Sequence, residues 1–361
     1  MAEPLKNLYN KKLISSLGSE IKKVYKKFDA EKFQKAVFCK EWEQKELKKR
    51  MRFIARTLSE FLPADYEKAI AILMPVSAVF DGFEYMFFPD FVECYGLENF
   101  NLSMEALARF TEHSSSEFAV RAFIKKYPER TMAEMARWAE SGNKYLRRLA
   151  SEGCRPRLPW ACALPEFKKN PAPALKIIKK LLNDKSEYVR RSAANNLNDI
   201  SKDNPRAVIN LAKKNKGKNK NTERLLKHGC RSLLRAGNAE VLALFGFTDA
   251  KHVKAANFKA PESVMMGQSL RLSFTLKTRE KKLGRLRLEY AVDFKKSNGK
   301  SRRKIFKISE GECALKEKSV TTSHSFRSIT TRKHYPGVHG IAIIVNGMEL
   351  ACRSFRLNEK N

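Results

Sequence analysis

The feature that most constrains the fold is a basic segment that recurs through the middle of the chain. SEYVRRSAANNL at 186–197 aligns with TERLLKHGCRSL at 222–233, and NKYLRRLA at 143–150 resembles the start of the first. The segments recur every 36–43 residues, and apolar helical stretches such as 174–182 precede them. This period is typical of HEAT-like repeats, in which helix pairs bury their apolar faces only by stacking. We therefore predict a mainly α fold, with a HEAT-like helical-repeat solenoid over residues 1–250.

The last third of the chain has a different periodicity. Apolar and polar side chains alternate over 269–277, 285–294, 304–308 and 340–346, and Asn346-Gly347 is a turn signal. A period of two indicates strands, and several short strands joined by turns are typical of a sandwich. The sequence therefore predicts a small all-β, immunoglobulin-like sandwich over residues 258–361.

Positive charge is unevenly distributed. Residues 1–112 hold 18 Lys and Arg against 17 Asp and Glu, residues 113–254 hold 31 against 13, and residues 255–361 hold 23 against 9. A neutral first third before a strongly basic remainder indicates a directed electrostatic face. Nucleic acid fits such a face best because its charge is the densest. A membrane surface, an acidic protein and a simple surplus for solubility are the alternatives.

Two repeats carry Arg-Arg at the same place, Arg147-Arg148 and Arg190-Arg191, and Lys227 matches Arg191 in the third. Equivalent positions of a solenoid project from one side, so these cations would form a stripe suited to a phosphate backbone. One arginine of each pair could instead bridge neighbouring repeats.

A polar, basic segment at 326–339 separates two of the predicted strands and is too long for a tight hairpin. Long loops are usually either functional or disordered. We predict that this loop contacts DNA through Arg332, Lys333, His334 and Tyr335.

The residue pattern also predicts what is absent. The seven cysteines form no C-x-x-C pair and the six histidines no H-x-x-x-H pair, so no metal site, disulfide framework or cofactor is expected. The start of the chain lacks the apolar core of a signal peptide, and the longest apolar run, 69–80, is too short to span a membrane. These features predict a cytoplasmic protein with no membrane partner.

The segment RRLASEGCRPRLPW at 147–160 is the most informative for chemistry. Glu152 ends a predicted helix in the most basic part of the chain, and Arg155, Arg157 and Trp160 follow on a stretch stiffened by prolines. We predict that Arg155 and Arg157 also contact DNA. Glu152 is then either a surface partner of Arg148, four residues earlier, or a carboxylate held in a positive cleft for catalysis. Trp160 is either a core residue or the wall of a site for a sugar or base.

Three runs, SSSEFAVRAFIKKYPERTM at 114–132, RRLASEGCRPRLPWA at 147–161 and YVRRSAANNLNDISKDNP at 188–205, resemble the AlkC family of DNA alkylation-repair glycosylases, which are HEAT-like relatives of AlkD. The resemblance covers about residues 80–250, and some members carry an immunoglobulin-like tail. One departure is Ala122, where a proline often follows FAVR.

The resemblance implies a monofunctional enzyme of base excision repair that works without a cofactor in the bacterial cytoplasm, at the nucleoid. It would hydrolyse the N-glycosidic bond of cationic bases in duplex DNA, chiefly 3-methyladenine and 3-methylcytosine, without fully flipping the base. Its site residues would be Glu117, Glu152, Trp160 and, less directly matched, Asp199. We expect a monomer.

The chemistry is consistent with this implication. A methylated base is already cationic and leaves without a general acid, so the enzyme must stabilise the oxocarbenium-like sugar and orient a water. A carboxylate ~4 Å from that cation contributes roughly 4 kcal/mol at an effective dielectric near 20, or about three decades of rate. The alternatives are a non-catalytic scaffold that recognises damaged or distorted duplex, and a HEAT-type adaptor for an acidic protein.

Overall fold

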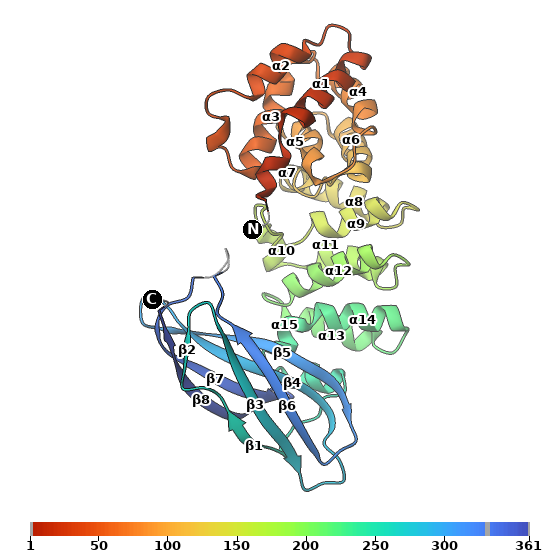
Figure 1. Ribbon diagram of the computed structural model, residues 1–361. Helices are drawn as coiled ribbons and strands as arrows, with labels where there is room; N and C mark the ends of the chain where they lie inside the picture. The colour runs from red at the N-terminus through yellow and green to blue at the C-terminus, as the bar shows by residue number, and fades with distance from the viewer. Residues whose placement is uncertain (1–2, 329–332, 360–361) are drawn as a thin grey trace. The chain divides into compact units, whose positions relative to one another are not determined.

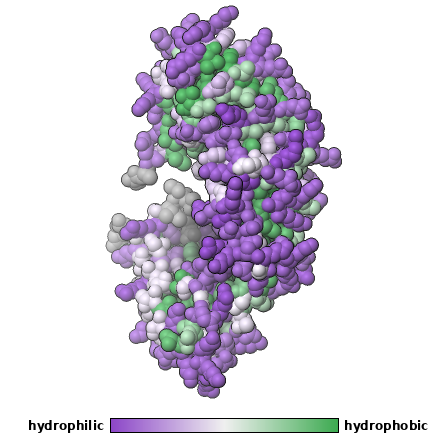
Figure 2. Space-filling view, turned by 90° about the vertical axis from the view of Figure 1, so that its right-hand side faces the viewer, coloured by the Kyte–Doolittle hydropathy of each residue, from purple (hydrophilic) through white to green (hydrophobic). Residues whose placement is uncertain are grey.

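The computed structural model describes residues 3–328 and 333–359 and separates into two compact units, Met1–Gly229 and Cys230–Asn361. The first unit is helical, and the second contains all eight described strands (Figure 1). Within the described residues, no helix is long and apolar enough to cross a membrane. Hydrophilic side chains cover most of the face seen in Figure 2, as expected for a net charge of +33.

The first half of the helical unit packs around an aromatic core. Asn10, Asp29 and Asp65 cap three of its helices by accepting a hydrogen bond from a backbone N–H of the first turn. Many of its buried side chains are phenylalanines, such as Phe33 and Phe88. Its helices are α1 (Lys11–Val24), α2 (Ala30–Val37), α3 (Leu47–Phe61), α4 (Tyr66–Ser77), α5 (Phe87–Tyr95) and α6 (Phe100–His113).

The second half consists of helices that stack in successive layers (Figure 1). Helix α12 packs against both α9 and α14, while α11 packs against α8. Gly229 of α14 allows a close approach, since a Cβ there would lie 2.6 Å from Leu197 of α12. The helices are α7 (Val120–Lys126), α8 (Pro128–Trp138), α9 (Lys144–Gly153), α10 (Pro165–Lys169), α11 (Ala172–Leu181), α12 (Glu187–Ile200), α13 (Pro205–Asn215) and α14 (Lys220–Gly229). A helical region before the β tail is confirmed. Two of its recurring basic segments coincide with α9 and α12, and the third, 222–233, begins in α14 and extends past its end at Gly229.

The second unit opens with two short helices, α15 (Arg231–Arg235) and α16 (Ala239–Leu244). Two sheets follow, with strand orders β1-β3-β6 and β2-β8-β7-β4-β5. Most of their buried apolar side chains form a core that includes Leu272, Phe274 and Val292, and a smaller cluster contains Ala291, Ala342 and Ile344. The strands are β1 (Val253–Lys259), β2 (Ser263–Met265), β3 (Ser269–Thr278), β4 (Gly284–Lys295), β5 (Ser301–Cys313), β6 (Glu317–Ser325), β7 (Gly337–Val345) and β8 (Met348–Asn358).

The predicted all-β tail is confirmed. Three predicted segments fall in β3, β4 and β5, and the fourth covers most of β7 and the first residue of the turn after it. Asn346 and Gly347 join β7 to β8 with φ values of 48° and 83°. Two successive residues with positive φ are what a two-residue hairpin turn of type I′ requires, which is why Asn-Gly predicted it.

Candidate active site

The loop after α9 is anchored by one buried arginine. Arg121 of α7 is fully buried, and its Nη1 donates to the carbonyl oxygens of Gly153 at 2.9 Å and Arg155 at 2.8 Å. Its Nε donates to the carbonyl oxygen of Cys162 at 2.9 Å. Burial lowers the pKa of Arg121, but hydrogen bonds to these carbonyl oxygens replace those that the guanidinium would form with water. Arg121 therefore ties both ends of the loop 153–162 to α7.

Trp160 stands on this anchored loop with 60% of its surface exposed, which excludes a core role. Its φ of 64° is unusual for a bulky residue, and such strain tends to occur at functional sites. The Trp160 carbonyl oxygen accepts a hydrogen bond from Lys48 Nζ at 2.7 Å. The Phe83 ring lies edge-on, with its centroid 6.2 Å from that of the indole. Trp160 thus presents a fixed aromatic surface to solvent.

Three carboxylates and two arginines alternate in a row beside this loop. Arg148 pairs with Glu117, and the Ser115 hydroxyl donates to Glu117 Oε2 at 2.6 Å. Arg155 pairs with Glu152 and, at 2.9 Å, with Asp199. We call Glu117, Arg148, Glu152, Arg155 and Asp199 the charged row. It joins the segment before α7 to the last turns of α9 and α12.

Glu152 is enclosed within the charged row. Its side chain is 8% exposed, Oε1 accepts from Arg155, and Oε2 accepts from the Ser192 hydroxyl at 2.6 Å. Arg148 Nη2 is more distant, 3.9 Å from Oε1. The interpretation of Glu152 as a surface residue is therefore wrong, because packing of α9 against α12 buries it. Its contact with Arg148 is present but longer than its pair with Arg155.

The ends of the charged row differ from its centre. The Glu117 side chain is 13% exposed, and its Oε1 accepts no hydrogen bond from the described residues. The Asp199 side chain is only 4% exposed. Its Oδ1 lies 3.0 Å from Nζ of Lys202, whose side chain is half-exposed. Burial acts to lower the pKa of Arg148 and Arg155, but the adjacent carboxylates outweigh burial and raise it. Both arginines stay charged and hold the carboxylates in place.

Comparisons with known proteins show the family of this chain. A model of the family "DNA alkylation repair enzyme" matches residues 111–232, and one of the C-terminal Ig-like domain of the uncharacterised protein YhaZ matches 254–359. An uncharacterised Bacillus subtilis protein, YhaZ, is 41% identical over 346 residues, 95% of this chain and 96% of its own. The alkylpurine DNA glycosylase AlkC of Pseudomonas fluorescens, solved on DNA containing an abasic-site analogue, is 35% identical. It superposes with a TM-score of 0.94 over 99% of this chain and all of its own.

The chain belongs to the AlkC family of DNA alkylation-repair enzymes. The motifs quoted for the resemblance lie in the matched region, and the strand-rich unit corresponds to the family's immunoglobulin-like domain. The sequence motifs located the charged row and Trp160, but not Arg121. A lone arginine within the apolar run of FAVRAFI was the available signal.

In this AlkC-family chain, the two arginines of each Arg-Arg pair have different environments. Arg147 is 6% exposed and forms two hydrogen bonds with Asp184, at 2.6 and 3.0 Å, while Arg190 donates to the Asp184 and Lys185 carbonyls. The pair with Asp184 favours the bridging alternative for Arg147, whereas Arg190 bonds the turn just before its own helix, α12. The second arginines differ, since Arg148 is in the charged row and Arg191 is 67% exposed.

The remaining predicted DNA contacts occupy varied positions. Arg157 is 40% exposed and pairs with Asp203, whereas Arg155 is buried in the charged row. Lys227 is in the last turn of α14 and interacts with another group of the protein. Near it, Arg191 and Arg224 line a pocket of about 470 Å³ between α12 and α14.

The described part of the predicted DNA-contacting loop belongs to the immunoglobulin-like unit. Lys333 Nζ lies 5.6 Å from the centroid of the Tyr335 ring. The His334 ring packs against Phe294 and Phe326. Arg332 lies outside the described residues. Among the described residues, no group of His, Cys, Asp and Glu side chains is arranged to hold a metal ion.

Proposed function

We propose that this chain is a monofunctional DNA glycosylase that hydrolyses the N-glycosidic bond of cationic alkylated bases in duplex DNA, chiefly 3-methyladenine and 3-methylcytosine. The observation that carries the proposal is the charged row beside the exposed Trp160. The similarity to a DNA-bound alkylpurine glycosylase supports it. We also assign α8 to α14 to HEAT-like repeats, because their helices pack in the layered order that such repeats use.

The carboxylates at the ends of the row suit the chemical step better than Glu152. Both Glu152 oxygens are committed to Arg155 and Ser192, so its task is to hold Arg155 in place. Glu117 has an oxygen to present to the oxocarbenium-like sugar, and Asp199 can exchange its half-exposed lysine partner for a water. Glu117 then stabilises the developing cation, while Asp199 orients the attacking water. The base leaves neutral, and the proton lost by the water goes to Asp199.

The direct test is base release from methylated duplex DNA. Incubation with the protein should liberate free 3-methyladenine and 3-methylcytosine and leave abasic sites in an otherwise intact strand. A Glu117→Gln variant purified in parallel controls for contaminating glycosylases. Binding of methylated duplex with no more base release than the variant gives would favour the non-catalytic scaffold. Strand cleavage coupled to release would contradict the monofunctional assignment.

Trp160→Ala should weaken binding to duplex that carries a lesion by about tenfold or more, because a stacked base contributes roughly 1–3 kcal/mol. Binding to undamaged duplex should change little. Trp160→Phe keeps an aromatic surface and should retain most of the preference for the lesion. Competition binding with matched damaged and undamaged duplexes measures both constants, and an unchanged ratio for Trp160→Ala would rule out contact with the lesion.

Arg191→Gln should weaken binding to every duplex by a similar factor, because Arg191 is exposed and would contact phosphate. Loss of one phosphate contact should make the slope of log affinity against log salt shallower by about 0.9. Lys176→Gln, an equal loss of charge at an exposed position of α11, should leave that slope unchanged. Sequence-dependent loss of affinity would instead indicate contact with a base.

A further inference from the structure

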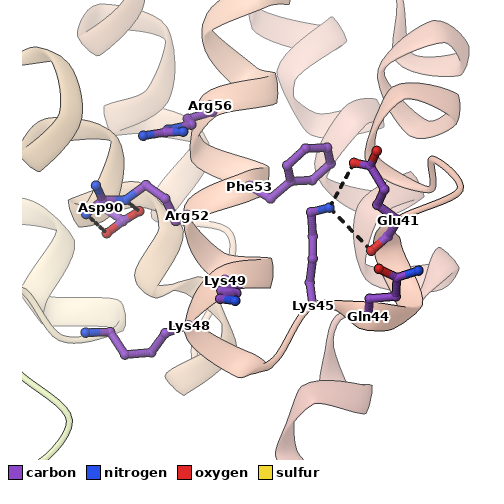
Figure 3. Close-up of a pocket in the computed structure, with 9 residues that line it drawn as sticks. All are labelled: Glu41, Gln44, Lys45, Lys48, Lys49, Arg52, Phe53, Arg56 and Asp90. Carbon is purple, nitrogen blue, oxygen red and sulfur yellow. Dashed lines mark hydrogen bonds and ion pairs between the residues drawn. The ribbon is translucent and has the colours of Figure 1, made fainter.

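Five cations follow one face of the segment that contains α3. They are Lys45, Lys48, Lys49, Arg52 and Arg56, spaced at three, four, seven and eleven residues from the first, and we call them the α3 cation row. Spacings of three, four and seven residues place side chains on the same side of a helix. Figure 3 shows the five around a pocket of about 750 Å³ that Phe53, Gln44, Glu41 and Asp90 also line.

The members of the α3 cation row are not equally engaged with acidic groups. Arg52 forms a bidentate pair with Asp90, at 2.6 and 2.9 Å, and also bonds Glu93. Lys45 lies 3.5 Å from Glu41 and packs over the Phe53 ring. These pairs fix the walls of the pocket and neutralise two of the five charges.

The other three cations are exposed. Lys48, Lys49 and Arg56 all face solvent, and none forms a salt bridge with an acidic residue of the described chain. Lys48 to Arg56 spans eight residues, or ~12 Å of helix. One DNA strand carries a phosphate for every ~3.4 Å of duplex axis, so the span covers about three or four phosphates.

Lys48 connects this surface to the candidate active site. Its Nζ donates to the Trp160 carbonyl oxygen at 2.7 Å and lies 4.5 Å from the centroid of the Phe118 ring. Phe118 directly follows Glu117 in the chain. A strand that passes Trp160 would therefore reach α3 at Lys48.

We propose that the α3 cation row binds the DNA backbone on one side of the lesion, through Lys48, Lys49 and Arg56. The proposal rests on the proposed function in one respect, namely that DNA approaches Trp160. Exposed, regularly spaced cations suit an extended polyanion. An acidic peptide would need apolar anchor sites as well, and among the described residues that line the pocket Phe53, half-buried under Lys45, is the one apolar side chain.

The test is the double variant Lys49→Gln/Arg56→Gln, which leaves Lys48 and the Trp160 loop untouched. On undamaged duplex of roughly 25 base pairs, affinity should fall about tenfold, and the log–log salt slope should become shallower by about 1.8. The matched control is Lys176→Gln/Lys179→Gln, which removes two exposed charges from α11 and should change neither quantity. Lys49→Arg/Arg56→Lys should bind like the wild type.

Nested duplexes locate the contact. Trimming the DNA on one side of a central lesion should abolish the difference between wild type and double variant, and trimming the other side should preserve it. Equal affinities and slopes for the double variant and its α11 control would overturn the proposal, as would a difference that survives trimming from either side. If the double variant lost binding to polyglutamate but kept its DNA binding, the partner would be an acidic protein. That result would also overturn the proposal. Because every readout is binding, a failure to release base would count against the proposed function alone.

Discussion

Glu117→Gln should slow single-turnover release of 3-methyladenine from duplex DNA by about two to three orders of magnitude. Glutamine retains the shape of the side chain and can still accept from the Ser115 hydroxyl, so the main change is loss of the negative charge. A carboxylate near the developing cation contributes roughly 4 kcal/mol, and Asp199 would compensate for part of its loss. Affinity for undamaged duplex should stay the same or rise, because a charge that repels phosphate is removed.

A rapid-quench assay with enzyme in excess separates this step from product release. Glu129→Gln removes an equal charge from an exposed position of α8 and serves as the matched control. Glu152→Gln should slow the reaction as well, but with a lower midpoint of thermal unfolding, because it leaves buried Arg155 with one carboxylate fewer. A wild-type rate for Glu117→Gln, beside a slow Asp199→Asn, would transfer the main electrostatic role to Asp199.

The elements that periodicity specifies were predictable from the sequence. Helices α9, α12 and α14 follow from the repeated basic segments, and β3, β4, β5 and β7 follow from alternation of apolar and polar side chains. Strands β1, β2, β6 and β8 were not identified one by one. Strand β2 has only three residues, and the buried positions of the others are interrupted by partly exposed ones, as in the pattern from Val253 to Lys259. Alternation of apolar and polar side chains is a weak signal in strands whose buried face is determined by tertiary contacts alone.

The candidate site was predictable only where a motif carried it. Glu117, Glu152, Trp160 and Asp199 came from motif resemblance, whereas the pairing of Arg155 with Asp199 joins residues 44 positions apart. The α3 cation row was missed because charge was summed over residues 1–112, where acidic and basic residues balance. The helix places Lys48, Lys49 and Arg56 on one face, and a net charge summed over the segment does not show this grouping.

Arg121→Leu should abolish most activity and lower the free energy of unfolding by roughly 3–5 kcal/mol. The substitution removes a fully buried guanidinium and leaves the carbonyl oxygens of Gly153, Arg155 and Cys162 without their donors. Unsatisfied buried acceptors cost about 1–3 kcal/mol each, less where the loop can move to reach water. Such movement would release the positive φ of Trp160 and displace the aromatic surface.

Chemical denaturation measures the loss of stability, and base release is then compared at a temperature where both proteins are folded. Arg121→Lys keeps the charge but cannot reach three carbonyls with a planar fork, so it should fall between wild type and Arg121→Leu in both measurements. Arg109→Leu, on the exposed side of α6, is the matched control and should affect neither strongly. A folded Arg121→Leu protein with the wild-type rate would show that the Trp160 loop keeps its geometry without this anchor, and the assignment of Arg121 as a positioning residue would then be wrong.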